Sequence, residues 1–279
     1  MKKYTTVQYK VNMIRPDIAP GRLRLAFLTD LHNCENAPKN QQILDDIREA
    51  DPDLILCGGD MLVGSLNTPF EAAVELLTTL VQEYPLYHAL GNHESRLMRY
   101  PHQYGLMYQD YTETLMEAGV LFLDNQSELI CIKGIPLQVA GLTLPQRFYR
   151  RIARDKLRAE DILDDLGEPN PKALNILLAH HPYHMEAYRN WGADLTLCGH
   201  YHGGMVRFGK HTGLLAPDVR FLDEHCHGLF DFHARITEGQ VVGYDSHVVV
   251  SAGLGEHSLP IRFHNPRELV FVDLELSRK

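Results

Sequence analysis

The chain has 279 residues, of which 44% are hydrophobic and 23% are charged, and these proportions argue against a disordered or fibrous protein. Its formal net charge of -9 argues against non-specific binding to nucleic acid, because such binding needs a basic surface that releases counterions. We therefore expect one large globular domain over residues 1–279.

The cysteines and the N-terminal residues indicate the compartment. The five cysteines are an odd number, are widely spaced and form no C-x-x-C pair, so neither a disulfide framework nor a zinc ribbon is indicated. The first residues lack the continuous apolar stretch of a signal peptide, and no later window has the roughly 18 apolar residues of a membrane span. We expect a soluble protein in a reducing cytoplasm.

Short apolar runs alternate with helical patterns along the chain. The alternating pattern from Thr6 to Met13 predicts a half-buried strand at a sheet edge. Short apolar runs predict fully buried strands at Leu25 to Leu28, Leu54 to Cys57, Leu86 to Leu90, Val120 to Leu123, Leu137 to Ala140, Leu174 to Ala179 and Leu195 to Cys198. The clearest helical pattern covers Pro69 to Glu83, behind a predicted capping box of Thr68 and Glu71. This alternation predicts an α/β fold with a largely parallel first sheet, and the strand-like segments from Met205 to Leu276 predict a second, mixed sheet.

Polar residues directly follow five of the predicted strands. In α/β folds ligands bind beyond the carboxyl ends of the strands, so side chains at these positions can meet at one sheet edge. The residues concerned are Asp30 and His32, Asp60, Asn92 and His93, His180, and His200 and His202. Taken singly, each has an ordinary structural explanation, such as a helix cap, a turn or a core histidine. Five strands that deliver oxygen and nitrogen ligands to one edge predict a metal site instead.

Spacing and glycine placement support that prediction. Asp30 and His32 are two residues apart, as are His200 and His202, so in an extended segment each pair would project to one side. The two glycines before Asp60 allow a sharp backbone turn that would point its carboxylate over the sheet edge.

The series resembles the calcineurin-like metallophosphoesterase family, whose motifs D-x-H, G-D, G-N-H, H and G-H-x-H occur complete and in order between Asp30 and His202. The tail, with Gly253 to Gly255, Leu259 to Phe263 and Pro266 to Glu268, is similar to one bacterial subgroup. That subgroup includes membrane-associated phosphodiesterases and pyrophosphatases that act on lipid-linked diphosphates. The resemblance implies a four-layer α/β/β/α sandwich of two mixed sheets.

The resemblance also implies the composition of the site. The first metal would take Asp30, His32 and His202, the second would take Asn92, His180 and His200, and Asp60 would bridge the two. Carboxylate, imidazole and amide ligands suit divalent or trivalent Mn, Fe, Zn, Co or Ni better than a thiolate-loving ion. Two such ions about 3.5 to 4 Å apart hold a hydroxide for in-line attack on phosphorus. His93 would donate a proton or a hydrogen bond to the leaving oxygen.

Three alternatives stay open. His181 directly follows His180, and His180 is preferred because the family's ligand lies two residues before the proline. Glu94 matches the G-N-H-E of protein phosphatases, but the arginines that grip a phosphoprotein phosphate in that branch are missing, so a protein phosphatase or other phosphomonoesterase is less favoured than a hydrolase of diesters or pyrophosphates. The alternative of a different class is a metal-free or catalytically weak binding scaffold, against which the intact ligand series and His93 argue.

Two segments outside the motifs are candidates for substrate recognition. The stretch between His93 and Val120 is rich in large residues and is either a helix packed on the core or a cap that lines the substrate site. The run from Arg147 to Arg158 predicts a basic helix with Phe148, Ile152 and Leu163 on its apolar face. Such a run indicates either a solvated helix surface or a peripheral contact with an anionic inner-membrane face or substrate. The expected partner is a phosphorylated small molecule or a lipid-linked substrate, and the sequence indicates no oligomeric state.

Overall fold

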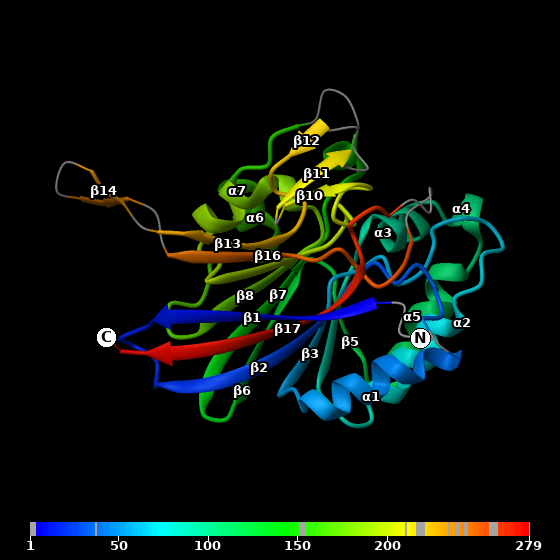
Figure 1. The fold of residues 1–279 in the computed structure, drawn as a ribbon, viewed down its shortest axis with the longest axis horizontal. Helices are drawn as coiled ribbons and strands as arrows, with labels where there is room; N and C mark the ends of the chain where they lie inside the picture. The colour runs from blue at the N-terminus through cyan, green and yellow to red at the C-terminus, as the bar shows by residue number, and fades with distance from the viewer. Residues whose placement is uncertain are drawn as a thin grey trace.

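Two six-stranded mixed sheets pack face to face, and helices cover their outer faces (Figure 1). The computed structural model describes residues 4–36, 38–150, 155–209, 211–215, 221–233, 235–237, 240–242, 245–256 and 262–278. The first sheet has the strand order β1 (Tyr4–Ile14), β17 (Arg267–Ser277), β2 (Gly21–Leu28), β3 (Leu54–Cys57), β4 (Leu86–Ala89) and β5 (Leu121–Leu123). The second has the order β13 (Gly228–Phe232), β16 (Ser246–Val250), β9 (Leu195–Cys198), β8 (Leu174–Ala179), β7 (Ile135–Leu142) and β6 (Gln126–Ile132). The four-layer α/β/β/α sandwich is confirmed.

Parallel pairing brings the carboxyl ends of the central strands to one edge of each sheet. Strands β2, β3, β4 and β5 pair in parallel, as do β16, β9, β8 and β7 in the second sheet. Strands β3, β8 and β9 are buried on both faces, which explains their largely apolar sequences, and they coincide with the predicted runs. The first strand, β1, lies at the edge of its sheet as its alternating pattern predicts.

The helices form the two outer layers. They are α1 (Gln41–Ala50), α2 (Glu71–Leu80), α3 (Asn92–Arg99), α4 (Pro101–Tyr104), α5 (Met107–Ala118), α6 (Ala159–Leu166) and α7 (Met185–Trp191), with short 3-10 helices η1 (Pro38–Asn40), η2 (Gln146–Tyr149) and η3 (Pro182–His184). Apolar side chains of α1, α2, α3 and α5 pack on the first sheet, whereas those of α6 and α7 pack on the second. Tyr111 and Leu115 of α5 are buried, so this part of the stretch between His93 and Val120 packs on the core. Among the described helices, none is long and apolar enough to cross a membrane.

The origin of the second sheet differs from the prediction. The segment from Met205 to Leu276 supplies β13 and β16 to that sheet, but β6 to β9 come from the middle of the chain and β17 inserts between β1 and β2 of the first sheet. An apolar strand sequence does not specify which sheet it joins, because both offer the same apolar surroundings. The later segment also forms two small sheets, one of β10 (Arg207–Phe208), β11 (Thr212–Leu215) and β12 (Phe221–Asp223), the other of β14 (Arg235–Thr237) and β15 (Gln240–Val242).

The start of α2 corrects the predicted capping box. The helix begins at Glu71 rather than Pro69, and its N-cap residue is Phe70 instead of Thr68. Two amides at the start of the helix have side-chain acceptors. The Phe70 N–H donates to the carboxylate of the next residue, Glu71 (2.9 Å), and the Ala73 N–H donates to Oδ1 of the distant Asn33 (3.1 Å). A cap supplied by a distant residue leaves no local sequence signal.

The basic run from Arg147 to Arg158 does not form the predicted single helix. Phe148 belongs to η2, residues 155–158 are not helical, and Ile152 lies outside the described residues. Helix α6 begins after its N-cap residue, Arg158. The Arg158 N–H donates to the Asp161 carboxylate (2.9 Å), and this hydrogen bond caps the helix. Leu163 is 37% exposed, because α6 buries the neighbouring Ile162 instead.

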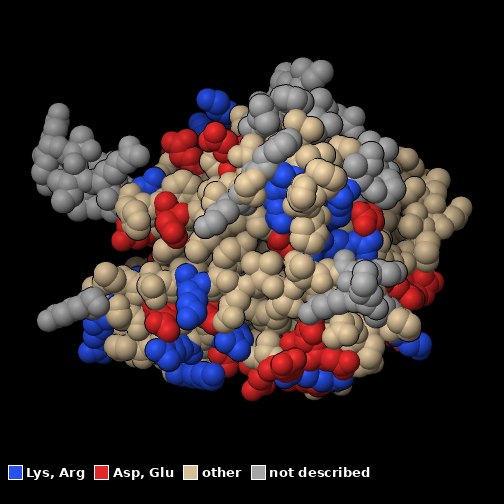
Figure 2. Space-filling model, viewed as in Figure 1, with Lys and Arg blue, Asp and Glu red and all other residues tan. Residues whose placement is uncertain are grey.

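The charged surface is mixed in sign. On the described part of the face in Figure 2, Lys and Arg side chains lie among Asp and Glu. Elsewhere in the described chain opposite charges are paired, as where Arg24 Nε lies 2.7 Å from Asp273 Oδ1. This face therefore lacks, among the described residues, the continuous basic surface that nucleic-acid binding requires.

The core between the sheets makes a prediction about stability. Ile176 of β8 is fully buried among side chains of both sheets, whereas Leu129 of β6 is 62% exposed. Ile176→Ala should lower the free energy of unfolding by about 2–5 kcal/mol, because it removes buried methyl groups and leaves a cavity. Leu129→Ala is the control and should change it by less than about 1 kcal/mol. Denaturant unfolding measures both, and similar losses for the two variants would contradict the proposed inter-sheet core.

Candidate metal centre

The predicted site residues lie in loops at the carboxyl ends of five strands. Asp30 and His32 follow β2, Asp60 follows β3, Asn92 opens α3 after β4, His180 follows β8, and His200 and His202 follow β9. The first three loops come from the first sheet and the last two from the second. The site thus spans the junction of the two sheets, and each sheet supplies a part of it.

Three groups of potential ligand atoms converge there, and one of them, His32, Asp60 and His93, shares a residue with each of the other two. The first cluster consists of Asp30, His32 and His202, and the second cluster consists of Asp60, His180 and His200. In the first, His202 Nε2 lies 3.2 Å from both Asp30 Oδ1 and His32 Nε2. In the second, His180 Nε2 lies 3.0 Å from Asp60 Oδ2 and also 3.8 Å from Asp30 Oδ1, so the two clusters adjoin. The first cluster has the residues of the first implied ligand set, and the second cluster has Asp60 beside two of the three residues of the second set.

The backbone at these residues is not extended, contrary to the expectation from their spacing. Asp30, His32, Asp60, His200 and His202 all have positive φ, between 47° and 67°. Such a conformation is uncommon for residues other than glycine and costs of order 1–3 kcal/mol each unless the surroundings hold it. The loops after β2 and β3 hold one another, because the Asp30 and His32 amides donate to the carbonyls of Gly59 (3.0 Å) and Asp60 (3.1 Å).

The donor set fits metal ions in two further respects. The Oδ1 of Asn92 is buried and has no hydrogen-bond partner among the described residues, as expected of an oxygen kept for a cation. The Nδ1 of His180 lies 2.8 Å from the carbonyl oxygen of Gly58, which can only accept, so Nδ1 carries the proton. Nε2 then faces the carboxylates, which is the orientation seen in metal-ligating histidines whose Nδ1–H is held by a carbonyl.

The electrostatics of the site favour a cation. Burial raises the pKa of the Asp30 and Asp60 carboxyls, but nearby histidines outweigh it and bring both pKa values below their ordinary range. Burial lowers the pKa of His180, whereas Asp60 and Asp30 raise it, to about 10. Burial lowers the pKa of His32 and His200, so both rings are neutral at pH 7 and can act as ligands. His180 Nε2 lies 3.0 Å from Asp60 Oδ2 and 3.8 Å from Asp30 Oδ1, a place where a cation would balance both carboxylates.

His93 lies beside the second cluster in a defined tautomer. The Gly64 N–H donates to its Nδ1 (2.7 Å), so the proton of the neutral ring is on Nε2. That Nε2 lies 3.9 Å from Asp60 Oδ2, and the His93 N–H donates to Asp60 Oδ1 (2.8 Å). Burial lowers the pKa of His93, which keeps the ring neutral. The ring therefore presents an N–H donor toward the site.

His181 is separated from the carboxylates by its neighbour. Its Nδ1 accepts the Tyr183 N–H (3.2 Å), and its ring packs 4.5 Å from the His200 ring, centroid to centroid. Neither cluster includes His181. The structure thus turns His180, and not His181, toward Asp60.

Sequence reasoning missed Glu94 as a functional residue. Its buried carboxylate accepts the N–H groups of Asp60 (2.8 Å), Met61 (2.8 Å) and Gly91 (3.0 Å), and so fixes the turn that points Asp60 into the site. Burial and the Asp60 carboxylate raise the pKa of Glu94 to about 7. The missed signal was an acidic residue at the third position of a helix, which is the position of a capping box.

Two other features of the site lie outside the five ligand motifs. The ring of Tyr149 in η2 lies 5.1 Å from the ring of His200 and 5.2 Å from that of His181, centroid to centroid. It therefore packs against one side of the second cluster. The loop after β16, residues 251–255, reaches the same edge because β16 pairs in parallel with β9. It contributes backbone groups rather than ligands, which motif reading does not detect.

Comparisons with known proteins agree with this geometry. Residues 23–204 match the profile described as calcineurin-like phosphoesterase. The chain belongs to this family. It is 29% identical over 212 residues to the phosphodiesterase YaeI of Escherichia coli (strain K12), an alignment that covers 73% of this chain and 68% of YaeI. It is 24% identical over 275 residues to YkoQ of Bacillus subtilis (strain 168), an uncharacterized metallophosphoesterase, with 95% and 90% coverage.

Among solved structures, the 5'-nucleotidase precursor from Thermus thermophilus superposes with a TM-score of 0.52 at 16% identity. The superposition covers 85% of this chain and 50% of the nucleotidase, so the chain spans half of that protein's length. The likeness shows a shared fold. Membership of the family makes the chain a metallophosphoesterase, a class that hydrolyses phosphate esters with divalent metals.

The hydrogen bonds of Glu94 generate a prediction. In Glu94→Gln an NH2 group replaces one acceptor oxygen, so at least one buried N–H among those of Asp60, Met61 and Gly91 loses its partner. The metal-free variant should lose about 1–3 kcal/mol of unfolding free energy. The matched control is Glu117→Gln on the exposed face of α5, which should change little. Equal stability of the two variants in denaturant titrations would show that Glu94 does not hold the Asp60 turn.

Proposed function

We propose that this protein hydrolyses phosphodiesters or pyrophosphates at a two-metal centre. The observation that carries the proposal is the pair of adjoining clusters, each with one carboxylate and two imidazoles at the same sheet edge. One cluster alone would fit a structural cation as well. Two that share the space between Asp30 and Asp60 fit a centre that holds two ions a short distance apart.

The ligand roles follow the clusters. Asp30, His32 and His202 would hold the first ion, and His180 and His200 would hold the second together with the unpartnered oxygen of Asn92. Asp60 lies next to His180 and His93 and would bridge the ions. When bound, two transition-metal ions supply a water-derived nucleophile at neutral pH and neutralise charge on the phosphoryl oxygens.

The chain's own residues would then orient the ester and assist its leaving group. Since Nδ1 of His93 accepts the Gly64 amide, its Nε2–H is available to donate a hydrogen bond to the leaving oxygen. A neutral ring that keeps its proton assists by hydrogen bonding rather than by full proton transfer. Tyr149 closes the opposite side of the second cluster and would limit the substrate's approach.

The preference for diesters or pyrophosphates rests on similarity. YaeI is named a phosphodiesterase, and the tail resembles a subgroup that acts on lipid-linked diphosphates. Rates on matched phosphomonoesters, phosphodiesters and pyrophosphates test the preference. A monoester hydrolysed faster than every diester and pyrophosphate would overturn it.

The two-metal centre predicts that the protein copurifies with about two transition-metal ions per chain. Asp60→Asn should empty or misplace both, because the variant removes the carboxylate that the ions share. Elemental analysis and hydrolysis of bis-p-nitrophenyl phosphate measure the effect, and Asp110→Asn on the exposed face of α5 is the control. Metal removal should also lower the thermal midpoint of the wild type, since ions that bind only the folded state stabilise it. Two bound metals and wild-type activity in Asp60→Asn would contradict the bridging role.

The proposed role of His93 predicts a dependence on the leaving group. An alkoxide leaves slowly unless its oxygen is hydrogen-bonded, whereas p-nitrophenolate needs little help. His93→Ala should therefore slow hydrolysis of an alkyl diester by about 10- to 100-fold, the effect of losing one hydrogen bond to a charged oxygen, and that of a p-nitrophenyl diester far less. His93→Gln, which keeps a hydrogen-bond donor, should lie between the alanine variant and the wild type.

The control for that experiment is His102→Ala in the exposed part of α4, with metal content measured for every variant. A misfolded or metal-depleted variant would lose both activities in similar proportion. Equal losses on the two substrates at full metal occupancy would assign His93 to orienting Asn92 or Asp60 instead.

A further inference from the structure

The tail motif has no part in the ligand sets, yet it lies against them. Strand β16 runs parallel to β9, so the residues that follow β16 emerge beside the loop that carries His200 and His202. We use the term clasp for residues Ala252–Glu256 together with Arg262 and Asn265. The clasp touches the loops of two first-cluster ligands, Asp30 and His202.

The backbone of the clasp binds the Asp30 loop. The Leu254 N–H donates to the carbonyl of Thr29 (3.1 Å), and the Gly255 N–H donates to that of Asp30 (2.6 Å). A Cβ at Gly253 would lie 2.6 Å from Asp30 Cβ, and one at Gly255 would lie 2.0 Å from the Leu31 carbonyl oxygen. Only glycine allows the two backbones to approach this closely, which accounts for the pair of glycines in the motif.

The side chains of the clasp bind the His202 loop. Arg262 Nη2 donates to the carbonyls of Ala252 (2.8 Å) and Gly255 (2.7 Å) and lies 3.2 Å from His202 Nδ1. Asn265 Nδ2 donates to the His202 carbonyl (2.6 Å) and is buried. Arg262 Nη1 also donates to the His202 carbonyl (3.5 Å), so one guanidinium connects the segment that braces Asp30 with the backbone of the His202 loop.

The clasp is suited to a strained pair of ligands. Asp30 and His202 both hold a left-handed backbone conformation, with φ of 52° and 48°, which persists only when the surroundings fix it. The Arg262 side chain is 12% exposed, and Glu256 at 3.3 Å partly compensates its buried charge. A guanidinium can serve two carbonyls and a carboxylate at once because its donors form a planar fork, and a lysine ammonium cannot reproduce that geometry.

We propose that Arg262 and Asn265 are positioning residues that set the affinity of the first metal by fixing Asp30 and His202 relative to each other. The proposal rests on the two-metal centre proposed above. Residues that orient metal ligands from behind typically change metal affinity by 10- to 100-fold when they are replaced. The second cluster has its own supports, Glu94 and the Gly58 carbonyl, so the effect should be confined to one ion.

The test is Co²⁺ titration of the metal-free full chain, with the affinity of each ion obtained by chelator competition. Arg262→Lys keeps the charge but loses the fork, and Asn265→Asp keeps the shape but loses the amide donor. Each should weaken one of the two binding steps by about 10- to 100-fold and leave the other within about threefold. The visible spectrum of bound Co²⁺ reports ligand geometry without reference to activity.

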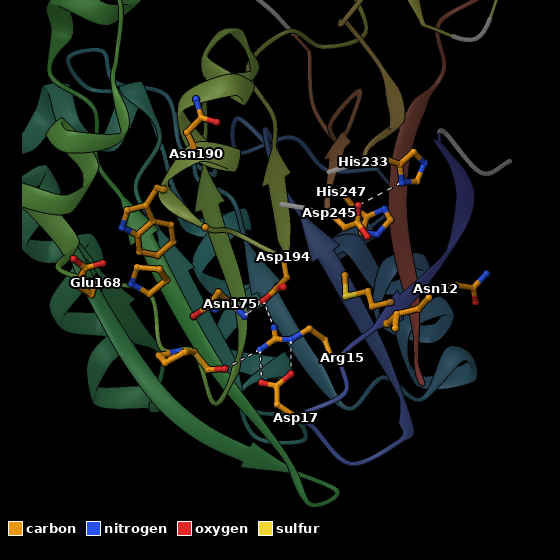
Figure 3. A pocket seen from close by; sticks show the side chains of 16 residues that line it. Asn12, Arg15, Asp17, Glu168, Asn175, Asn190, Asp194, His233, Asp245 and His247 are labelled. Atoms are coloured by element: carbon orange, nitrogen blue, oxygen red, sulfur yellow. Dashed lines mark hydrogen bonds and ion pairs between the residues drawn. The ribbon is translucent and has the colours of Figure 1, made fainter. Parts of the chain in front are cut away.

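The matched control is Arg15→Lys at the opposite edge of the sheets, in the wall of a cavity of about 960 Å³ (Figure 3). Arg15 is also a part-buried arginine, 16% exposed, and it binds the Asp194 carboxylate and two carbonyls, those of Pro171 and Ala173 (both 3.1 Å). Its replacement should lower stability without changing either binding step. The thermal midpoints of the metal-free variants show how much each change affects folding alone.

The outcomes separate the two proposals. Unchanged affinity for both ions in Arg262→Lys and in Asn265→Asp would overturn the positioning role of the clasp. So would a result in which Arg262→Lys weakens the binding of both ions and Arg15→Lys weakens it equally. A wild type that binds no Co²⁺ or only one ion would contradict the two-metal centre itself. Weakening of a single ion in both clasp variants, with Arg15→Lys like the wild type, supports the assignment.

Discussion

Two buried carboxylates at one point of the molecule impose the main constraint on this structure. Asp30 and Asp60 are almost inaccessible to water, and both lie within 4 Å of the same nitrogen, His180 Nε2. Like charges in a medium of low polarity repel strongly, so they must be balanced by cations, protons or hydrogen-bond donors. The histidines around them supply part of that balance, and backbone amides supply more, since the His200 N–H donates to Asp30 and the His93 N–H to Asp60.

The packed sheets stabilise the strained loops that carry these carboxylates and histidines. The strands that precede the ligands are rigid and buried, so the strain of left-handed residues falls on short loops whose ends are fixed. Each of these loops is also tied to another: the β2 loop to the β3 loop, the β3 turn to Glu94, and the β9 loop to Asn265. The free energy that core packing contributes thus supports a site that would not hold its shape as an isolated peptide.

Most of the fold, and the gathering of the candidate site residues at one edge, could be predicted from the sequence, because both depend on local patterns. Apolar runs such as Leu54 to Cys57 mark central strands, and ligands placed directly after such runs must share an edge if the strands are parallel. The features that escaped prediction depend on contacts between distant residues. Asn33 caps α2, Arg262 contacts the His202 loop, and β17 pairs with β2 in the first sheet. The positive φ of Asp30 also escaped, since two-residue spacing is compatible with both an extended and a coiled loop.

The insertion of β17 between β1 and β2 bears on the order in which the molecule can assemble. Tyr4 pairs with Arg267 and Phe27 with Val270, so the first and second strands of the chain are joined only through a strand near the other end. Contacts of such large sequence separation form late, because their loop-closure entropy must be overcome before they add stability. Without β17, β2 has no partner on its β1 side, so the sheet whose loops carry Asp30 and His32 depends on a strand made more than 200 residues later.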